Sequence, residues 1–547
     1  MKRFIVPLII ALLLVSTILT SCGGDTTTTS TTKTTSTSST TPGSTTTTTT
    51  STTGTTATST TTATTAMPGE YGGTLRILYP YTIASIPGWP SDSTNAQRGS
   101  AAWTIFEPMI KQDKSGNPIP WLATDWEWGE NKADITFNLR DDVTFHDGTK
   151  FTADAVKLEG DLCIEAKLAN AVDWDRWEVI NDYTIKLYLK QYKTDFWANV
   201  TGINMCFFSP TAYEQNGKEW MMEHPIGTGP FKYLSFEKDV ALKVVRNDNY
   251  WKAGLPYLDE IDHIITKDQN TRRMALMSGE GDVSFNEQAK FLFDMKELGY
   301  DVRSAYGGTD FIMFNTMNAD SIYNDARIRQ AIEYALDKET MAETLGYGYY
   351  IANNQMPPPD NPSHNNDLPS REYNTDKAKQ LLADAGYPDG FAATMITIGA
   401  STTAQVIQES LKAVGINVEF ESVDNAKFWD YMRNGWGNSM VYVGYAVGIN
   451  YPAWLKQYFP PTSTLDVSVK LPDEMVEKIS PALAEQDETK AKELSDELIQ
   501  LTWDDAILVP IYSNSLGDVI SPKVHDTGMF DFVDFSIWSP EATWMEQ

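Results

Sequence analysis

The chain has 547 residues, of which 41% are hydrophobic, and its formal net charge is −30. This acidity disfavours nucleic acid and anionic surfaces as partners. The length and the 16 Trp and 25 Tyr residues allow a large buried core divided into two or three lobes.

The first residues have the pattern of a secretory signal. Lys2 and Arg3 precede an apolar run over residues 4–19, which is shorter than the ~20 residues of a membrane-spanning helix. Leu19-Thr20-Ser21-Cys22 follows and resembles the bacterial lipobox, in which the cysteine is acylated and begins the mature chain. The alternative is an ordinary signal peptide with an incidental cysteine. We predict a signal peptide over residues 1–21 and acylation of Cys22, for example by palmitate.

Residues 25–66 are almost entirely Thr and Ser. Apart from Pro42, no apolar side chain there is larger than alanine, so burial cannot offset the entropy of ordering the segment. As a random coil its ends would lie roughly 35 Å apart. We expect residues 22–67 to be a disordered tether between a lipid anchor and the folded part. An O-glycosylated stalk fits the same composition.

Strand and helix patterns then alternate along the chain. Alternating β-branched and aromatic residues predict strands over residues 72–79, 125–128, 134–140, 183–189, 241–246, 261–265, 394–398 and 417–421. Apolar residues at helical spacing predict helices through residues 106–110, after the N-cap Thr152, and over residues 326–336, 377–385, 403–414 and 488–502. This mixture predicts an α/β protein with more than one sheet.

The sequence gives little support for the motifs of enzymes or of metal sites. His146-Asp147-Gly148 fits a hairpin turn better than an acid–base pair, and Gly227-Thr228-Gly229 lacks the lysine of a phosphate loop. The five histidines lie far apart, and the sequence has no Cys-x-x-Cys. We therefore predict no catalytic residue, no metal and no cofactor. Cys163 and Cys206 are left open as either a disulfide or two free thiols.

Several longer motifs occur in the order of one known family. They are Phe106-Glu107-Pro108-Met109, residues 120–126 (PWLATDW), residues 137–148 (FNLRDDVTFHDG), residues 151–156 (FTADAV), residues 225–231 (PIGTGPF), Asn249-Tyr250-Trp251, Phe314-Asn315-Thr316, residues 325–332 (DARIRQAI) and residues 386–391 (GYPDGF). In these motifs the chain resembles the bacterial extracellular solute-binding proteins of family 5, the oligopeptide-, dipeptide- and nickel-type receptors of ABC importers. The motifs are spread over nearly all of the chain after the tether.

The resemblance implies an α/β fold of the periplasmic-binding-protein-like type II, with two hinged lobes that close like a clam shell and an extra inserted domain. The expected parts are the signal peptide (1–21), the lipidated Cys22 and tether (22–67), lobe I (68–112, 205–316 and 506–547), the inserted domain (113–204) and lobe II (317–505). It also implies a small-molecule or peptide ligand, delivery to the permease subunits of an ABC importer, and an extracytoplasmic monomer held on the membrane by its lipid.

One segment of lobe II corresponds to the part of peptide-binding relatives that places an aspartate against the ammonium group of a peptide. Here Tyr445 falls at the aromatic position and Gly448 falls where that aspartate would be. An ammonium buried without a carboxylate costs several kcal/mol, so the sequence puts a free peptide N-terminus in doubt as the anchor. The residues expected to touch the ligand are Trp89, Trp103, Arg433, Tyr442, Tyr445, Asn450 and Trp454.

Two kinds of alternative stay open. Within the transport class, oligosaccharides and metal chelates compete with short peptides, because flat aromatic walls suit sugars as well as amides. Outside this class, the tryptophans are compatible with a secreted glycan hydrolase, and the receptor architecture is compatible with signalling instead of transport. For Arg433 a solvated surface position competes with a contact to a ligand carboxylate.

Overall fold

The computed structural model describes residues 69–83, 86–89, 101–532 and 537–547. The predicted signal peptide, the lipidation site Cys22 and the tether lie outside these residues. Within the described part of the chain, no helix combines the length and the apolar composition needed to cross a membrane.

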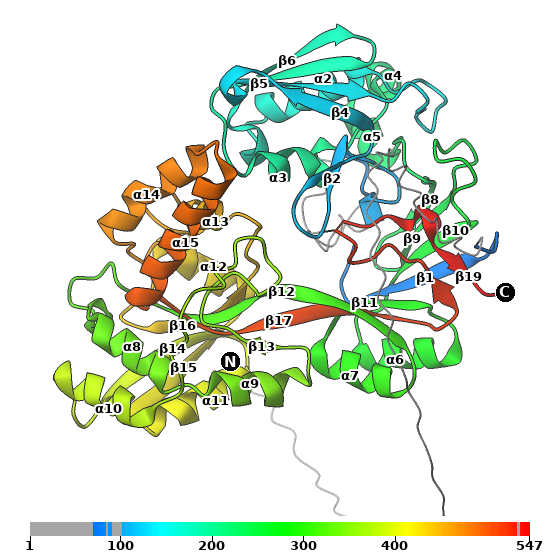
Figure 1. Ribbon diagram of the computed structural model, residues 1–547. Helices are drawn as coiled ribbons and strands as arrows, with labels where there is room; N and C mark the ends of the chain where they lie inside the picture. The colour runs from blue at the N-terminus through cyan, green and yellow to red at the C-terminus, as the bar shows by residue number, and fades with distance from the viewer. Residues whose placement is uncertain (1–68, 84–85, 90–100, 533–536) are drawn as a thin grey trace, which may run out of the picture. The chain divides into compact units, whose positions relative to one another are not determined.

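One large mixed sheet of eleven strands organises most of the fold (Figure 1). Its order is β15 (Ile416–Val423), β14 (Phe391–Ile398), β16 (Met440–Tyr445), β12 (Asp301–Phe314), β17 (Leu508–Ile520), β11 (Val283–Gln288), β1 (Thr74–Tyr79), β10 (Glu260–Ile265), β9 (Ala241–Arg246) and β8 (Phe231–Glu237), and β13 (Ile351–Ala352) pairs with β17. The mixed sheet and its helices confirm the α/β fold predicted from the sequence.

Two long strands, β12 and β17, connect the two halves of this sheet. They pair antiparallel along most of their length, from Asp301↔Ile520 to Met313↔Leu508. On one side of them, β1 pairs in parallel with β10 and β11; on the other side, β14 pairs in parallel with β15 and β16. We call β11, β1, β10, β9 and β8 the first half, β16, β14 and β15 the second half, and β12 and β17 the central strands.

Helices cover both faces of the second half (Figure 1). Strand alternation explains this, because Phe311 and Met313 of β12 point into one core while Ile312 and Phe314 point into another. The first core packs against α12 (Asn425–Asn434), α13 (Tyr451–Tyr458), α14 (Asp473–Ala484) and α15 (Glu488–Asp504). The second core packs against α8 (Ala326–Tyr334), α9 (Lys338–Gly346), α10 (Thr375–Asp384) and α11 (Thr402–Lys412).

The first half is also buried on both faces. On one face α6 (Gln269–Ser278) and α7 (Ala289–Glu297) pack on the sheet, where Leu292 and Met295 meet Val519 of β17. On the other face lies a larger core that contains Trp89, Trp103 and Trp538. The short helices α4 (Pro210–Asn216) and α5 (Lys218–Glu223) and the strand pair β18 (Val524–His525) and β19 (Trp544–Met545) border this core.

A separate antiparallel sheet of four strands has its own core. Its order is β4 (Ala123–Trp128), β5 (Asp134–Leu139), β7 (Thr184–Leu189) and β6 (Trp174–Asn181), and α2 (Ala153–Glu165) packs on it. The hairpin of β2 (Ile110–Gln112) and β3 (Pro118–Pro120) precedes it, and α3 (Phe196–Thr201) follows it. This small sheet falls within the predicted inserted domain, whose boundaries stay a prediction.

Most of the strands and helices predicted from the sequence are present, and one is wrong. Residues 106–110 do not form a helix, because Pro108 makes an isolated bridge to Cys206 and Ile110 begins β2. Phe106 and Ile110 are both buried, but in two different cores, so their helical spacing arises from tertiary packing. Cys163 and Cys206 are both free and buried, which decides the alternative left open above.

Candidate ligand-binding site

The segment from the end of β16 to the start of α13 is held in a defined shape. Asn361 donates hydrogen bonds from its side-chain amide to the carbonyls of Val447 (3.1 Å) and Gly448 (3.3 Å). The hydroxyl of Ser363 donates to the carbonyl of Ile449 at 2.8 Å. The carbonyl groups of this segment are therefore fixed by the loop that precedes α10.

Gly448 is the open position of this segment. A Cβ atom built on it would meet no atom within 4 Å. The structure therefore has room for the aspartate of peptide-binding relatives at this point, and this chain presents only backbone there. Residue 448 itself therefore offers a ligand ammonium only its carbonyl dipole, and no carboxylate lies within 4 Å of the Cβ position.

Asn450 joins this segment to the region that follows the small sheet. Its side-chain oxygen caps α13 by accepting a hydrogen bond from the amide of Ala453 (2.9 Å). Its side-chain nitrogen donates to the hydroxyl of Thr194 at 2.8 Å. Asn450 therefore already has two partners in this conformation.

Tyr445 and Trp454 belong to an aromatic cluster on the face of β16 that α12 and α13 cover. The Tyr445 side chain is 6% exposed, and its ring packs on Phe311 (5.3 Å between centroids). Its hydroxyl donates to Asp466 at 3.0 Å, and burial raises the pKa of that carboxyl group to about 7. Trp454 is buried and stacks on Tyr451. This cluster holds two of the seven predicted residues.

The other predicted residues lie apart from this cluster or at its edge. Arg433 is exposed at the end of α12, with its guanidinium 5.8 Å from the ring of Trp429. Tyr442 points to the opposite face of β16 and donates to Asp310. Trp89 and Trp103 are packed in the core of the first half, with 3% and 4% of their surface exposed. Contact of these residues with a ligand stays a prediction.

Asp518 on β17 is a buried acid that the sequence analysis missed. It is 1% exposed, and it accepts a hydrogen bond from the amide of Asn286 at 2.8 Å. Its other oxygen has no hydrogen-bond partner among the described residues, and neither has the buried hydroxyl of Tyr81. Burial raises the pKa of Asp518 to about 7, and the charge of Glu287 acts in the same direction. Its only sequence signal is a charged residue in an otherwise uncharged strand.

Four of the family motifs meet at another buried acid, Glu107, which is 3% exposed. Its carboxylate accepts hydrogen bonds from the hydroxyl of Tyr250 (2.7 Å), the hydroxyl of Thr228 (2.9 Å) and the indoles of Trp121 (2.9 Å) and Trp251 (3.1 Å). Burial raises its pKa, while these bonds and the charge of Lys111 act against that rise. Glu107 thus fixes loops that lie far apart in the sequence.

A fifth motif adds to the same anchoring. The amide of His146 donates to the carbonyl of Gly227 at 2.9 Å, and its ring nitrogen Nε2 lies 3.0 Å from the carbonyl of Gly229. Burial lowers the pKa of His146 to about 4, so the ring is neutral at pH 7. His146 lies in a turn, as predicted, and its contacts are those of a structural residue.

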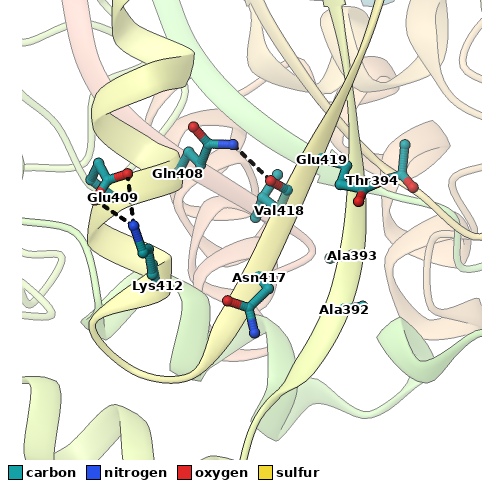
Figure 2. Close-up of a pocket in the computed structure, with 9 residues that line it drawn as sticks. All are labelled: Ala392, Ala393, Thr394, Gln408, Glu409, Lys412, Asn417, Val418 and Glu419. Carbon is teal, nitrogen blue, oxygen red and sulfur yellow. Dashed lines mark hydrogen bonds and ion pairs between the residues drawn. The ribbon is translucent and has the colours of Figure 1, made fainter.

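A groove of about 500 Å³ lies at the edge of the sheet, between α11 and the strands β14 and β15 (Figure 2). Two of its three exposed charges, Glu409 and Lys412, pair with each other at 3.3 Å, and the third is Glu419. Gln408 donates to the carbonyl of Val418 at 2.7 Å. None of its lining residues carries a buried polar atom without a partner. This groove therefore shows no buried polar group without a partner that would indicate a ligand site. In the described part of the chain, no group of three or more His, Cys, Asp or Glu residues could hold a metal ion.

A family profile decides the class of protein. The profile described as "Bacterial extracellular solute-binding proteins, family 5 Middle" matches residues 117–466. The chain belongs to this family. The resemblance to this family, predicted from the motifs, is confirmed. The similar proteins described in the next paragraph are named as binding proteins and not as enzymes.

Three similar proteins illustrate the range of the family. The chain is 30% identical over 347 residues to the glutathione-binding protein GsiB of Pectobacterium atrosepticum, which covers 61% of this chain and 66% of that protein. The periplasmic binding protein DppA of Helicobacter pylori, in complex with the peptide STSA, has a TM-score of 0.71 and 21% identity and covers 87% of this chain and 99% of that one. NikA of Brucella suis, in complex with Fe(III)-EDTA, has a TM-score of 0.75 and 23% identity and covers 86% of this chain and 100% of that one. The two structures confirm the fold.

Proposed function

We propose that this protein is the extracytoplasmic substrate-binding lipoprotein of an ABC importer, and that it captures a short peptide or a peptide-like solute. The observation that carries this proposal is the family match along residues 117–466. The glutathione-binding relative and the peptide-bound DppA structure support a peptide-like ligand. Acylation of Cys22 would hold the protein at the membrane, where it delivers the ligand to the permease subunits.

Capture would take place by closure of the two halves around the ligand. Contacts between the region of the small sheet and the second half support this part of the proposal. The amide of Thr194 donates to the carbonyl of Leu483 (2.8 Å), and Lys132 donates to the carbonyl of Gln486 (3.0 Å). The bond from Asn450 to Thr194 lies in the same contact. Such polar contacts can form and break with little cost, as an opening motion requires.

The absence of a side chain at Gly448 narrows the class of ligand that we propose. A peptide whose charge lies only at its N-terminal ammonium would find no carboxylate there. We therefore propose that recognition rests on amide groups and side chains of the ligand, with the aromatic residues around Tyr445 as one wall. Glutathione fits this class, because it carries amide bonds and its charge is spread over several groups.

Native mass spectrometry of gently purified protein, followed by calorimetry, tests the proposal. We expect a co-purified peptide-like mass, and saturable binding of glutathione or of a short peptide such as STSA. A panel of oligosaccharides and metal chelates serves as the control. Binding of only those compounds would overturn the peptide part, and hydrolysis of a glycan panel would overturn the binding-protein part.

Labelling with an alkyne fatty acid tests the anchor separately. We expect label on the wild-type protein expressed in a bacterial host and none on Cys22→Ala. Equal labelling of both proteins would contradict acylation at Cys22.

A further inference from the structure

A second cavity, of about 630 Å³, lies beside the central strands, and both Tyr442 and Tyr445 of β16 are among its lining residues. The central strands β12 and β17 form its floor, and its walls come from the end of α9, the start of α11 and the start of α7. Figure 1 shows these helices on one side of the central strands. This volume is in the range of cavities that hold small molecules, ~300–1,000 Å³.

The residues that line this cavity all belong to the described part of the chain, and Asp310 is the one charged residue among them. Its carboxylate accepts hydrogen bonds from the hydroxyl of Tyr442 and from the side-chain amide of Asn514, the latter at 2.5 Å. Both donors are neutral, so the negative charge has no opposite charge beside it. Burial therefore raises the pKa of Asp310, and the hydrogen bonds only reduce that rise.

Tyrosines surround this carboxylate. Tyr350 and Tyr512 stack with their centroids 4.9 Å apart and 18° between their planes. Tyr512 is held by a hydrogen bond of 2.7 Å between its hydroxyl and that of Thr403. Tyr347, at the C-cap of α9, is exposed and lines the cavity as well, but the ammonium of Lys290 already lies 5.5 Å from its ring centroid, so Tyr350 and Tyr512 supply the rings for a ligand. The cavity thus combines one carboxylate with several aromatic rings.

Gly444 and Gly308 allow β12 and β16 to pack closely beside Asp310. A Cβ atom on Gly444 would lie 2.5 Å from an oxygen of the Asp310 carboxylate, and one on Gly308 would lie 2.5 Å from the carbonyl oxygen of Tyr445. A purely structural role for Asp310, as a link between β12, β16 and β17, accounts for its two hydrogen bonds. It does not account for a cavity of about 630 Å³ beside this carboxyl group, with no cationic side chain among the residues that line the cavity.

We propose that this cavity is a second binding site, and that it takes a small organic cation with a substituted ammonium group. A carboxylate supplies the opposite charge, and tyrosine faces attract a cation within about 6 Å of the ring centroid. A metal ion fits poorly, because one carboxylate with both oxygens already in use does not provide the several oxygen ligands that hard cations need. An anion would be repelled by Asp310. A neutral sugar would leave the charge uncompensated.

The proposed site lies on the strands that connect the two halves of the sheet, so a bound cation would act on these strands. It lies on the central strands, and β12 shows register shifts on both sides of Thr309, between Tyr306 and Gly308 and between Asp310 and Phe311. A bound cation would therefore contact the strands that connect the two halves. Any effect on ligand capture rests on the proposed function, but binding of the cation itself does not.

Calorimetry with choline, tetramethylammonium and putrescine tests the site, and 3,3-dimethyl-1-butanol serves as the neutral counterpart of choline. We expect at least one of the three cations to bind saturably and the neutral alcohol not to bind. Asp310→Asn should weaken this binding by at least about tenfold, because it removes the charge opposite to that of the ligand. Asp161→Asn, on the exposed face of α2, is the control for the change in net charge.

A blocking variant keeps the test decisive if Asp310→Asn fails to fold. Ala400 is exposed and lines the cavity, so Ala400→Trp should fold and fill the space. We expect it to abolish cation binding and to leave binding of glutathione or STSA unchanged. Absence of binding by all three cations, equal binding by the alcohol, or unchanged binding in Ala400→Trp would each overturn the site. Loss of peptide binding alone, with cation binding intact, would bear on the proposed function and not on this cavity.

Discussion

Glu107 and Asp518 are both buried carboxyl groups, but their surroundings differ. Glu107 lies in one family motif and receives hydrogen bonds from four side chains that belong to three others. Asp518 receives one backbone hydrogen bond, and one of its oxygens has no partner among the described residues. The signature residues of the family therefore build the scaffold. Asp518, which keeps an oxygen without a partner among the described residues, lies outside those motifs.

Replacing Glu107 should have the largest effect on stability. In Glu107→Ala the four donors lose their shared acceptor, and the buried Lys111 loses a neighbouring negative charge. We expect a loss of about 3–5 kcal/mol in the free energy of unfolding, as for other broken buried networks. Urea denaturation followed by tryptophan fluorescence measures it. Thr228→Val removes only one donor and should cost about 1 kcal/mol. Equal effects of the two variants would show that Glu107 is not the centre of the network.

Replacing Asp518 should increase the free energy of unfolding, whereas replacing Glu107 should decrease it. Its pKa is raised to about 7 in the folded protein and is ~4 in an unfolded chain, so folding is favoured at low pH and this advantage is lost as the pH rises from ~4 through ~7. Asp518→Asn should therefore match the wild type near pH 4 and exceed it by several kcal/mol above pH 7. Denaturation at a series of pH values measures the difference, and Asp161→Asn should show none.

The ligand affinity of Asp518→Asn shows whether Asp518, unlike Glu107, has a role in binding. If the partnerless oxygen of Asp518 takes part in capture, Asp518→Asn weakens binding of the co-purified ligand while it stabilises the protein. A gain in stability with unchanged affinity would instead make Asp518 a residue without a role in binding.

Tyr445→Phe should have an intermediate effect. The change removes the one hydrogen bond that the Asp466 carboxyl group accepts among the described residues, and burial already raises the pKa of this group to about 7. We expect a loss of about 1–3 kcal/mol above pH 7, where the acid is charged, and a smaller loss near pH 5. Tyr451→Phe, which loses only a bond to the neutral hydroxyl of Thr502, is the control and should show no such pH dependence. The burial of Tyr445 also means that its replacement by alanine would destabilise the core as well as affect binding.

The sequence predicted the features that depend on local patterns, and the family motifs predicted the fold. The strand β1 and the helices α8 and α15 follow from residues within each segment. The contacts of Glu107 do not, because Trp251 lies 144 residues away in the chain. The error at residues 106–110 has the same cause, since two separate cores produced an apparent helical period. The surroundings of Asp518 and Asp310 could not be predicted from the sequence, because neither residue belongs to a motif and their neighbours come from several strands.

Gly448→Asp should have the smallest effect on stability and tests the candidate site most directly. A side chain at this position meets open space, and the glycine is not among the residues with positive φ, so the free energy of unfolding should change by less than about 0.5 kcal/mol. The new carboxylate would face the position of a peptide ammonium in relatives. We expect affinity for a peptide with a free N-terminus to rise about tenfold, because a charge-assisted hydrogen bond contributes ~1.5–3 kcal/mol. Calorimetry with the same peptide in free and N-acetylated form measures this. An equal gain for the acetylated peptide would show that the effect does not arise from the ammonium, and no gain for either would place the ligand's N-terminus away from Gly448.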